Sequence, residues 1–518
     1  MKVLFVTFFL LASNTVLLAT PPQPHIIFII ADDLGWDDVG FHGSDIRTPN
    51  IDKLAHSGII LNQYYVSPIC SPTRSAIMTG RHPIHTGLQH EVIGGATPYG
   101  LPLNETTMAQ HLKTLGYATH IVGKWHLGFF SRDYLPTSRG FDSHFGYYTG
   151  HEDYFDHTAE DSGFWGLDLR RNLDAVWDMN EKYATEIFTN EAENIILSHN
   201  QSAPLFLYLA HQAVHAGNYH GDPLEAPQHY IDRFPDIHDK NRRIFAGMVS
   251  ALDDSVGNLT RVLQETGMLP NTIMIFTTDN GGPTNGYDRN AACNWPLRGV
   301  KNTMWEGGVR GTGFVHSALL KRSQYVQENL MHVTDWLPTL YQAACGDPSH
   351  LGDIDGQSLW DMLTNQGHPV RKEVLHNIDP IGNFSALRMG EYKLVMGDIS
   401  HGFYDSWYPP PRSFVSVNRS VYSKDDFFKL KSKAISVNCG PKPANASINC
   451  QPEKRPCLFH IPSDPCEFSN IASDNKYLVQ LFLDRLEQLE SSMVPPLNTP
   501  IDPKGNPALH GGVWQWWK

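Results

Sequence analysis

The segment at residues 68–80, Pro-Ile-Cys-Ser-Pro-Thr-Arg-Ser-Ala-Ile-Met-Thr-Gly, carries the cysteine best placed to do chemistry in this chain. Pro72 suits the first turn of a helix, and Gly80 suits the residue that ends one. We therefore expect a helix that begins near Cys70. Free N–H groups and the macrodipole at a helix N-terminus attract anions, so Cys70 and Arg74 are placed to meet a negatively charged substrate. A lone cysteine is otherwise most often a small buried apolar residue.

Two clusters of oxygen-bearing side chains each follow an apolar run. Asp32 and Asp33 come directly after residues 25–31, and Asp279 and Asn280 follow residues 273–278. Carboxylate and amide oxygens are hard ligands that suit Ca²⁺ or Mg²⁺ better than zinc. An acidic pair after a strand is more often a cap or a turn, but two such clusters behind separate strands favour a metal site.

The elements that position these residues alternate between strands and helices. Apolar runs at residues 25–31, 204–210 and 273–278 predict buried strands, and residues 119–122 predict a fourth. Amphipathic helices are expected at residues 107–115 and from about 242 to 266. This alternation predicts an α/β fold with a large, mainly parallel sheet flanked by helices.

Residues suited to chemistry repeatedly follow the predicted strands. Asp32, Lys124, His215 and Asp279 each come soon after one. Ligands of open α/β sheets bind outside the carboxyl ends of the strands. The sequence therefore predicts one site at this edge of the sheet.

The chain changes character after about residue 375. A hairpin is expected at residues 386–396, followed by a loop-rich stretch with cysteines and an amphipathic helix over residues 478–493. We expect a smaller α+β domain with an antiparallel sheet at residues 381–518, after a catalytic domain at residues 23–380.

Several features favour passage through the secretory pathway. Residues 1–22 have the charged, apolar and small-residue regions of a signal peptide, and no later run is long enough to span a membrane. Sequons for N-glycosylation fit that route. They begin at Asn104, Asn200, Asn258, Asn383, Asn418 and Asn445. A net charge of −14 argues against a general nucleic-acid binder.

The cysteine count also suits an oxidising compartment. Of seven cysteines, six remain when Cys70 is set aside, enough for up to three disulfides. Close spacing favours Cys439 with Cys450 and Cys457 with Cys466, although sequence alone cannot choose among the pairings.

The motifs together resemble the sulfatase family. The resemblance rests on residues 31–36, 70–80, 123–128, 214–215, 278–282 and 305–310. More narrowly, residues 294–299, 335–339 and 375–379 resemble the arylsulfatase B group of that family. The resemblance covers most of the chain from about residue 25 and implies an alkaline-phosphatase-like fold.

The resemblance also implies a chemistry and a role for each site residue. Cys70 would be oxidised to formylglycine by a formylglycine-generating enzyme and act as the nucleophile, with Arg74 and His126 also catalytic. Lys124, His215 and Lys301 would bind the substrate sulfate. The same resemblance implies Ca²⁺ as the metal. Its ligands would be Asp32, Asp33, residue 70, Asp279 and Asn280.

The expected activity is hydrolysis of a sulfate monoester, with N-acetylgalactosamine 4-sulfate of a glycosaminoglycan as the substrate. The expected location is the lysosome or the extracellular space. Alternatives are a sulfatase of another specificity, a phosphoester hydrolase of the same superfamily, or a silent glycan-binding homologue. The chain departs from close relatives at His151, where they carry serine, and at residues 216–222, which resemble an insertion.

Overall fold

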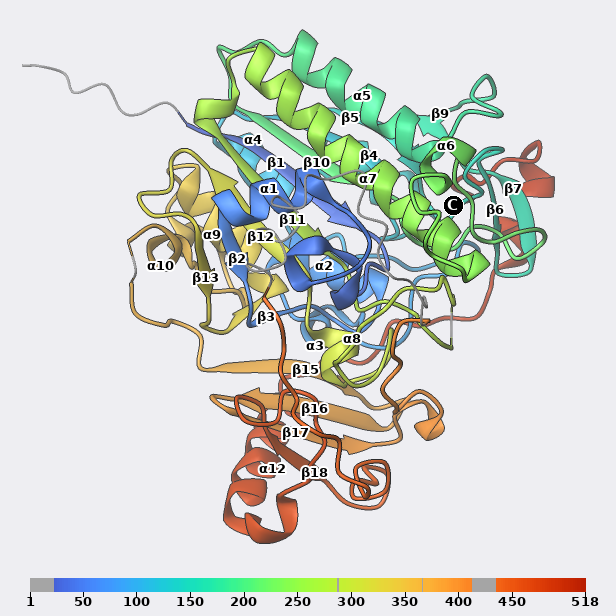
Figure 1. Cartoon of the computed structure of the whole chain (residues 1–518). Helices are drawn as coiled ribbons and strands as arrows, with labels where there is room; N and C mark the ends of the chain where they lie inside the picture. The colour runs from blue at the N-terminus through green and yellow to red at the C-terminus, as the bar shows by residue number, and fades with distance from the viewer. Residues whose placement is uncertain (1–22, 287, 366, 412–434) are drawn as a thin grey trace, which may run out of the picture.

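A sheet of ten strands forms the centre of the molecule (Figure 1). The computed structural model describes residues 23–286, 288–365, 367–411 and 435–518, so the predicted signal peptide and Asn418 lie outside the described residues. In spatial order the strands are β13 (Tyr325–Gln327), β2 (Ile59–Leu61), β12 (Gly313–Ser317), β11 (Thr272–Thr278), β1 (His25–Ala31), β10 (Leu205–Ala210), β4 (Ala118–Lys124), β5 (Ser143–Tyr147), β8 (Arg170–Arg171) and β9 (Asp174–Ala175).

The five central strands, from β11 to β5, are parallel, and antiparallel pairs lie toward both edges. The β1 register sets Ile29 beside Leu209 on β10 and Phe276 on β11. Every residue of β1, β10 and β11 is buried, which explains their continuous apolar sequences. The predicted mixed, mainly parallel sheet is confirmed.

Helices cover both faces of this sheet, as the alternating sequence predicts. One face packs against α1 (Pro49–Ser57), α5 (Ala184–Ser198) and α7 (Lys240–Glu265). The other packs against α2 (Cys70–Thr79), α4 (Met108–Thr114), α9 (Trp336–Ala343) and α10 (Trp360–Asn365). Alternate residues of β1 enter the two cores, with Ile27 on the first side and Phe28 on the second. None of the described helices is long and apolar enough to cross a membrane.

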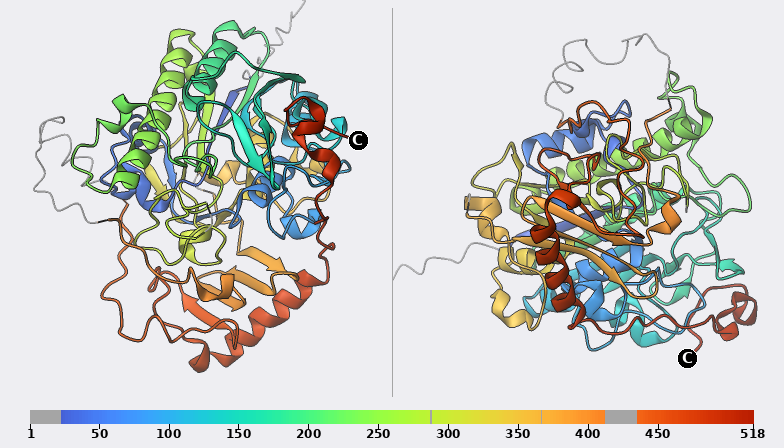
Figure 2. Two further views of the ribbon diagram at one scale, coloured as in Figure 1. Left: turned by 90° about the vertical axis from the view of Figure 1, so that its right-hand side faces the viewer. Right: turned by 90° about the horizontal axis from the view of Figure 1, so that it is seen from below.

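A second, antiparallel sheet lies below the large one and is covered by a helix on its far side (Figure 2). It contains β15 (Glu373–Asp379), β16 (Phe384–Met389), β17 (Tyr392–Gly397) and β18 (Cys457–His460), and α12 (Lys476–Glu490) packs against it. The hairpin and the amphipathic helix expected here are confirmed. The division at residue 381 stays a prediction, and β15 on its N-terminal side pairs with β16.

The small sheet uses its two faces differently. Leu387 and Leu394 pack against Phe482 and Leu486 of α12. Ala386 and Val395 face the other way, toward Met304 and Trp305, which precede α8 (Glu306–Val309). The small sheet is thus held between its own helix and the large unit.

A separate hairpin, β6 (Thr158–Asp161) with β7 (Phe164–Leu167), lies beside the C-terminal tail. Leu167 bridges to Val513, and the buried Trp514 donates its ring N–H to the carbonyl of Ala159 at 3.0 Å. The tail therefore returns from the small sheet to the large unit.

The predicted disulfide pairing is wrong. Cys439 pairs with Cys466, and Cys450 pairs with Cys457. Each pair belongs to one apolar cluster: the first packs with Trp407 and the second with Phe459. Cys450 and Cys457 are only 7 residues apart, closer than either predicted pair, whereas 27 residues separate Cys439 from Cys466. Spacing could therefore have indicated the second bridge but not the first. Cys70, Cys293 and Cys345 are not in disulfides.

Candidate active site

Cys70 is the first residue of α2, as the proline and glycine pattern predicts. Ile69 before it is extended, and Gly80 after the helix has a left-handed φ of 66°, which glycine adopts without a steric penalty. The Thr73 hydroxyl accepts a hydrogen bond from the Ser67 N–H at 2.9 Å and anchors the entry to the helix. The Cys70 side chain is buried, and its Sγ lies 3.7 Å from Asp32 Oδ1.

The strand register brings the two predicted oxygen clusters together. Ala31 of β1 is the partner of Thr278 of β11, so the residues that follow them meet at one level. The Asp33 N–H donates to Asp279 Oδ1 at 3.2 Å, and Asn280 Nδ2 donates to Asp33 Oδ1 at 2.6 Å. Asp33 has a left-handed φ of 59°, which marks a sharp turn directly after β1. These side chains have no exposed area.

Each of these buried carboxylates lies beside a cation, and Arg74 also lies 3.5 Å from Asp32. Lys124 Nζ lies 2.5 Å from Asp32 Oδ2, Arg74 donates two hydrogen bonds to Asp279 Oδ2 at 2.7 and 3.1 Å, and Lys301 Nζ lies 2.8 Å from Asp33 Oδ1. Burial by itself raises the pKa of Asp32, but Lys124, His215 and Arg74 outweigh it and hold that pKa below its usual value. We call these six residues the catalytic cluster. They are Asp32, Asp33, Asp279, Arg74, Lys124 and Lys301.

The two predicted histidines border this cluster in different ways. His126 Nε2 lies 3.1 Å from the carbonyl of Ile93, so this nitrogen carries the hydrogen and Nδ1 is an acceptor. Burial, followed by Lys124 and Arg74, holds the pKa of His126 well below its usual value, so the ring is neutral. His215 Nδ1 faces the carbonyl of Ala216 at 2.6 Å, and its Nε2 lies 3.3 Å from Lys301 Nζ.

The oxygen atoms of Asp32, Asp33 and Asn280 fit a hard divalent cation, whereas the sulfur of Cys70 and the ring nitrogen of His215 beside them are softer donors. Ligand atoms of Asp32, Asp33, Cys70 and His215 all lie within 4.8 Å of one another. Asn280 Oδ1 is buried and has no hydrogen-bond partner among the described residues, which leaves a neutral oxygen free to ligate. All the predicted site residues are thus brought together at one edge of the sheet.

The structure adds two residues that the motifs did not identify. Asp288 Oδ2 lies 2.8 Å from Lys301 Nζ and 3.4 Å from His215 Nε2. The ring of His151 stacks on His215 with centroids 5.5 Å apart. The sequence departure at His151 pointed to this position, whereas Asp288 lies in an irregular loop that carries no recognisable motif.

Comparison with known proteins gives the family. The model of a family described as Sulfatase matches residues 24–346, which is more than half of the 518 residues. The chain belongs to the sulfatase family. Members of this family hydrolyse sulfate esters, so the chain is assigned to the sulfuric ester hydrolases.

Named relatives span most of this sulfatase. Mouse arylsulfatase J is 42% identical and covers 96% of the chain and 80% of its own length. Human N-acetylgalactosamine-6-sulfatase is 31% identical over 69% of the chain and 68% of its own length. Human arylsulfatase A is 29% identical over 91% and 88%. The narrower likeness to arylsulfatase B stays a prediction.

Solved structures agree with the fold. The structure of Ps i-CgsB in complex with k-i-k-neocarrahexaose superimposes with a TM-score of 0.72 and 27% identity. It covers 94% of this chain and 98% of that chain. The predicted alkaline-phosphatase-like architecture is therefore confirmed.

Proposed function

We propose that this sulfatase uses formylglycine at position 70 to cleave the 4-sulfate of N-acetylgalactosamine at the end of a glycosaminoglycan chain. The observation that carries the reaction is the position of Cys70 at the N-terminus of α2, beside Asp32 and surrounded by the cations of the catalytic cluster. Sγ of Cys70 stands in for a hydroxyl of the hydrated aldehyde.

In the first step, one hydroxyl of the hydrated aldehyde gives up its proton and attacks the sulfur. The bond between sulfur and the sugar oxygen breaks, and that oxygen takes up a proton as it leaves. Lys301 and His215 lie 3.3 Å apart and are the candidate proton donors. Arg74 and Lys124 hold the sulfate oxygens as negative charge develops on them. Each preorganised donor of this kind is worth about 10²- to 10³-fold in rate.

In the second step, the remaining hydroxyl loses its proton, the aldehyde carbonyl re-forms and sulfate leaves. His126 is the candidate base, because its ring is neutral and its Nδ1 has no hydrogen-bond partner among the described residues. Water then hydrates the aldehyde for the next cycle. An unmodified cysteine has no second hydroxyl and cannot complete this elimination.

We propose Ca²⁺ as the metal, held by Asp32, Asp33, Asp279, Asn280 and residue 70. When bound, it supplies positive charge that polarises a sulfate oxygen and stabilises the nucleophile. A flexible set of oxygen ligands suits Ca²⁺ better than Mg²⁺, which demands strict octahedral geometry.

Elemental analysis tests the metal. We expect about one calcium per chain, because a single oxygen cluster follows β1 and β11. We also expect Asp279→Ala to lose the ion and the stabilisation that calcium gives against thermal unfolding. Stoichiometric zinc, or full activity of Asp279→Ala, would overturn the assignment.

The choice of sugar rests on the likeness of residues 294–299, 335–339 and 375–379 to the arylsulfatase B group, and the named relatives include enzymes that act on sulfated N-acetylgalactosamine. The test compares sulfate release from N-acetylgalactosamine 4-sulfate, N-acetylgalactosamine 6-sulfate and an aryl sulfate. Faster turnover of the 4-sulfate supports the proposal. Cleavage of only the 6-sulfate or the aryl ester would refute the sugar assignment and leave the sulfatase assignment intact.

Maturation follows from the same proposal. The chain enters the secretory pathway, where a formylglycine-generating enzyme modifies Cys70, and it acts in the lysosome or outside the cell. The two disulfides support an oxidising compartment.

A further inference from the structure

The ring of His126 depends on one carbonyl for its protonation pattern. Its Nε2–H donates to the carbonyl of Ile93 at 3.1 Å, so Nδ1 carries no hydrogen and can accept a proton. Gly150 lies directly against the ring, because a Cβ at this glycine would lie 3.0 Å from His126 Cε1. The ring is therefore confined by Gly150, and the carbonyl of Ile93 sets which nitrogen carries the hydrogen.

Ser71, the neighbour of Cys70 in α2, connects the same two residues. The Ser71 hydroxyl donates to the carbonyl of His126 at 3.0 Å and accepts from the Ile93 N–H at 3.1 Å. With the bond from His126 Nε2 to the carbonyl of Ile93, these contacts form a closed ring of three residues. A displacement of Ile93 would therefore disturb both the hydroxyl beside the nucleophile and the ring of the base.

Ile93 lies in an irregular stretch, residues 87–99, which we call the Ile93 segment. It contains no helix or strand, so many of its backbone groups need hydrogen-bond partners from other parts of the chain. The small sheet provides one of them, because Asn377 Nδ2 of β15 donates to the carbonyl of Gln89 at 2.8 Å. The position of Ile93 thus depends on elements that lie far from it in the sequence.

The C-terminal tail provides further partners. Residues 494–502, which we call the tail segment, follow α12 on the way from the small sheet back to the large unit (Figure 2). The Leu497 N–H donates to the carbonyl of Gly87 at 2.8 Å, and the Asp502 N–H donates to the carbonyl of Ala96 at 2.8 Å. The tail segment is therefore bonded to the Ile93 segment near both of its ends.

Asn498, in the middle of the tail segment, makes the side-chain contacts that bracket Ile93. Its Nδ2 donates one hydrogen to the carbonyl of His90 at 3.1 Å and the other to the hydroxyl of Tyr99 at 3.1 Å. The Tyr99 hydroxyl in turn donates to the carbonyl of Val92 at 3.2 Å. One amide thus joins the residues just before Ile93 to the residue that ends the Ile93 segment.

We infer that Asn498 is a positioning residue for the base of the second step. It fixes the Ile93 segment, and the carbonyl of Ile93 keeps His126 in the tautomer whose Nδ1 takes the proton of the second hydroxyl. The electron pair of that O–H bond forms the aldehyde carbonyl as the carbon–oxygen bond to sulfate breaks, and sulfate leaves with the pair of that bond. The inference rests on the proposed function, in which His126 is this base.

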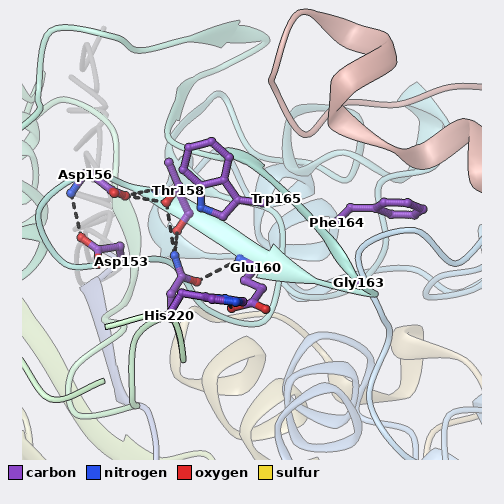
Figure 3. A pocket seen from close by; sticks show the side chains of 9 residues that line it. Asp153, Asp156, Thr158, Glu160, Gly163, Phe164, Trp165 and His220 are labelled. Carbon is purple, nitrogen blue, oxygen red and sulfur yellow. Dashed lines mark hydrogen bonds and ion pairs between the residues drawn. The ribbon is translucent and has the colours of Figure 1, made fainter. Parts of the chain in front are cut away.

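The last part of the tail packs elsewhere and offers a matched control. It lies against one face of the β6–β7 hairpin, where a Cβ at Gly166 would lie 2.5 Å from Pro507 Cβ. Trp165 on the other face lines a cavity of about 570 Å³ (Figure 3). Asn506 accepts a hydrogen bond from the Ala508 N–H at 3.0 Å, so its side-chain bond stays within the tail. Asn506→Ala is therefore the control for Asn498→Ala.

The test uses an aryl sulfate, whose good leaving group makes the second step limit turnover. Asn498→Ala should lower kcat about tenfold, a part of the 10²- to 10⁴-fold that acid–base catalysis contributes. It should leave kcat/KM within about twofold of the wild type, because that ratio reports only the first step. Intact-protein mass spectrometry during turnover should show chains that carry sulfate at residue 70. Tyr99→Phe should give the same pattern, and Asn506→Ala should match the wild type.

A double variant shows whether Asn498 acts through His126. In a His126→Ala background, Asn498→Ala should lower kcat no further, because the group that it positions is gone. The same loss in both backgrounds, or a fall in kcat/KM that matches the fall in kcat, would overturn the inference. Sulfated chains that accumulate in His126→Ala but not in Asn498→Ala would refute the inference alone. If they accumulate in neither variant, the base assignment of the proposed function fails with it.

Discussion

Two buried charge clusters in this molecule look alike and differ in one respect. The catalytic cluster lies at the carboxyl ends of the central strands. The inter-sheet cluster, defined here as Lys393, Glu306 and Glu467, lies between the large unit and the small sheet. Lys393 Nζ is 2.9 Å from an oxygen of each glutamate, and all three side chains have no exposed area.

The difference lies in the groups that surround the charges. In the inter-sheet cluster Glu306 also accepts from the Tyr65 hydroxyl at 3.0 Å, and Glu467 accepts from the Glu306 N–H at 2.8 Å. Around the catalytic cluster, three buried polar atoms have no hydrogen-bond partner among the described residues. They are one terminal nitrogen of Arg74, His126 Nδ1 and Asn280 Oδ1. Glu467 Oε1 also lacks a hydrogen-bond partner, although it lies 2.9 Å from Lys393 Nζ. At the catalytic cluster the unpaired atoms surround the nucleophile position and include a neutral oxygen, which suits a bound ligand.

The largest expected effect is on activity alone. Cys70→Ala should lower kcat by about 10⁶-fold, as loss of a nucleophile does, because no other group can form the sulfate intermediate. Thermal unfolding should change little, since the hydrogen-bond contact of the thiol among the described residues is the long one to Asp32, at 3.7 Å. Substantial residual turnover would contradict the role of residue 70.

A substitution in the inter-sheet cluster should lower stability and leave activity unchanged. Lys393→Met leaves two buried carboxylates without their shared cation, so the free energy of unfolding should fall by about 3–5 kcal/mol. The kcat of the folded fraction should stay near the wild-type value. Denaturant unfolding and active-site-normalised kinetics measure the two quantities. A large loss of kcat with unchanged stability would mean that this cluster also serves catalysis.

Removing one cation of the catalytic cluster should lower activity less than removing the nucleophile does. Lys301→Met should lower kcat/KM by about 10²- to 10³-fold, the value of one preorganised donor. Steady-state kinetics with an aryl sulfate provides the measurement. A change of less than about threefold would remove Lys301 from the list of sulfate-handling residues.

The smallest expected effect is at Asp288, which pairs with Lys301 and hydrogen-bonds Tyr219. Asp288→Asn should raise KM by up to about tenfold and change kcat less, because misplacing Lys301 weakens substrate positioning. Tyr219→Phe, which removes only the hydroxyl contact, is the milder companion. An unchanged KM in both variants would show that this contact has no role in binding.

The centre of the fold could be predicted because local signals and tertiary packing agree there. The apolar run at residues 25–31 and the proline and glycine around α2 each indicate one conformation. The β6–β7 hairpin and the loop with Asp288 carry weaker local patterns, and their positions depend on contacts such as Asn218 with Thr158 and Asp288 with Lys301. The bridge between Cys439 and Cys466 was missed for the same reason, because it joins residues 27 apart that meet beside Trp407.

Mass spectrometry of the peptide that contains residue 70, on protein of measured specific activity, tests the central claim most directly. The account predicts an aldehyde at residue 70 that reacts with a carbonyl probe, in a fraction that rises in proportion to activity across preparations. A fully active preparation whose residue 70 is an unmodified thiol would contradict it.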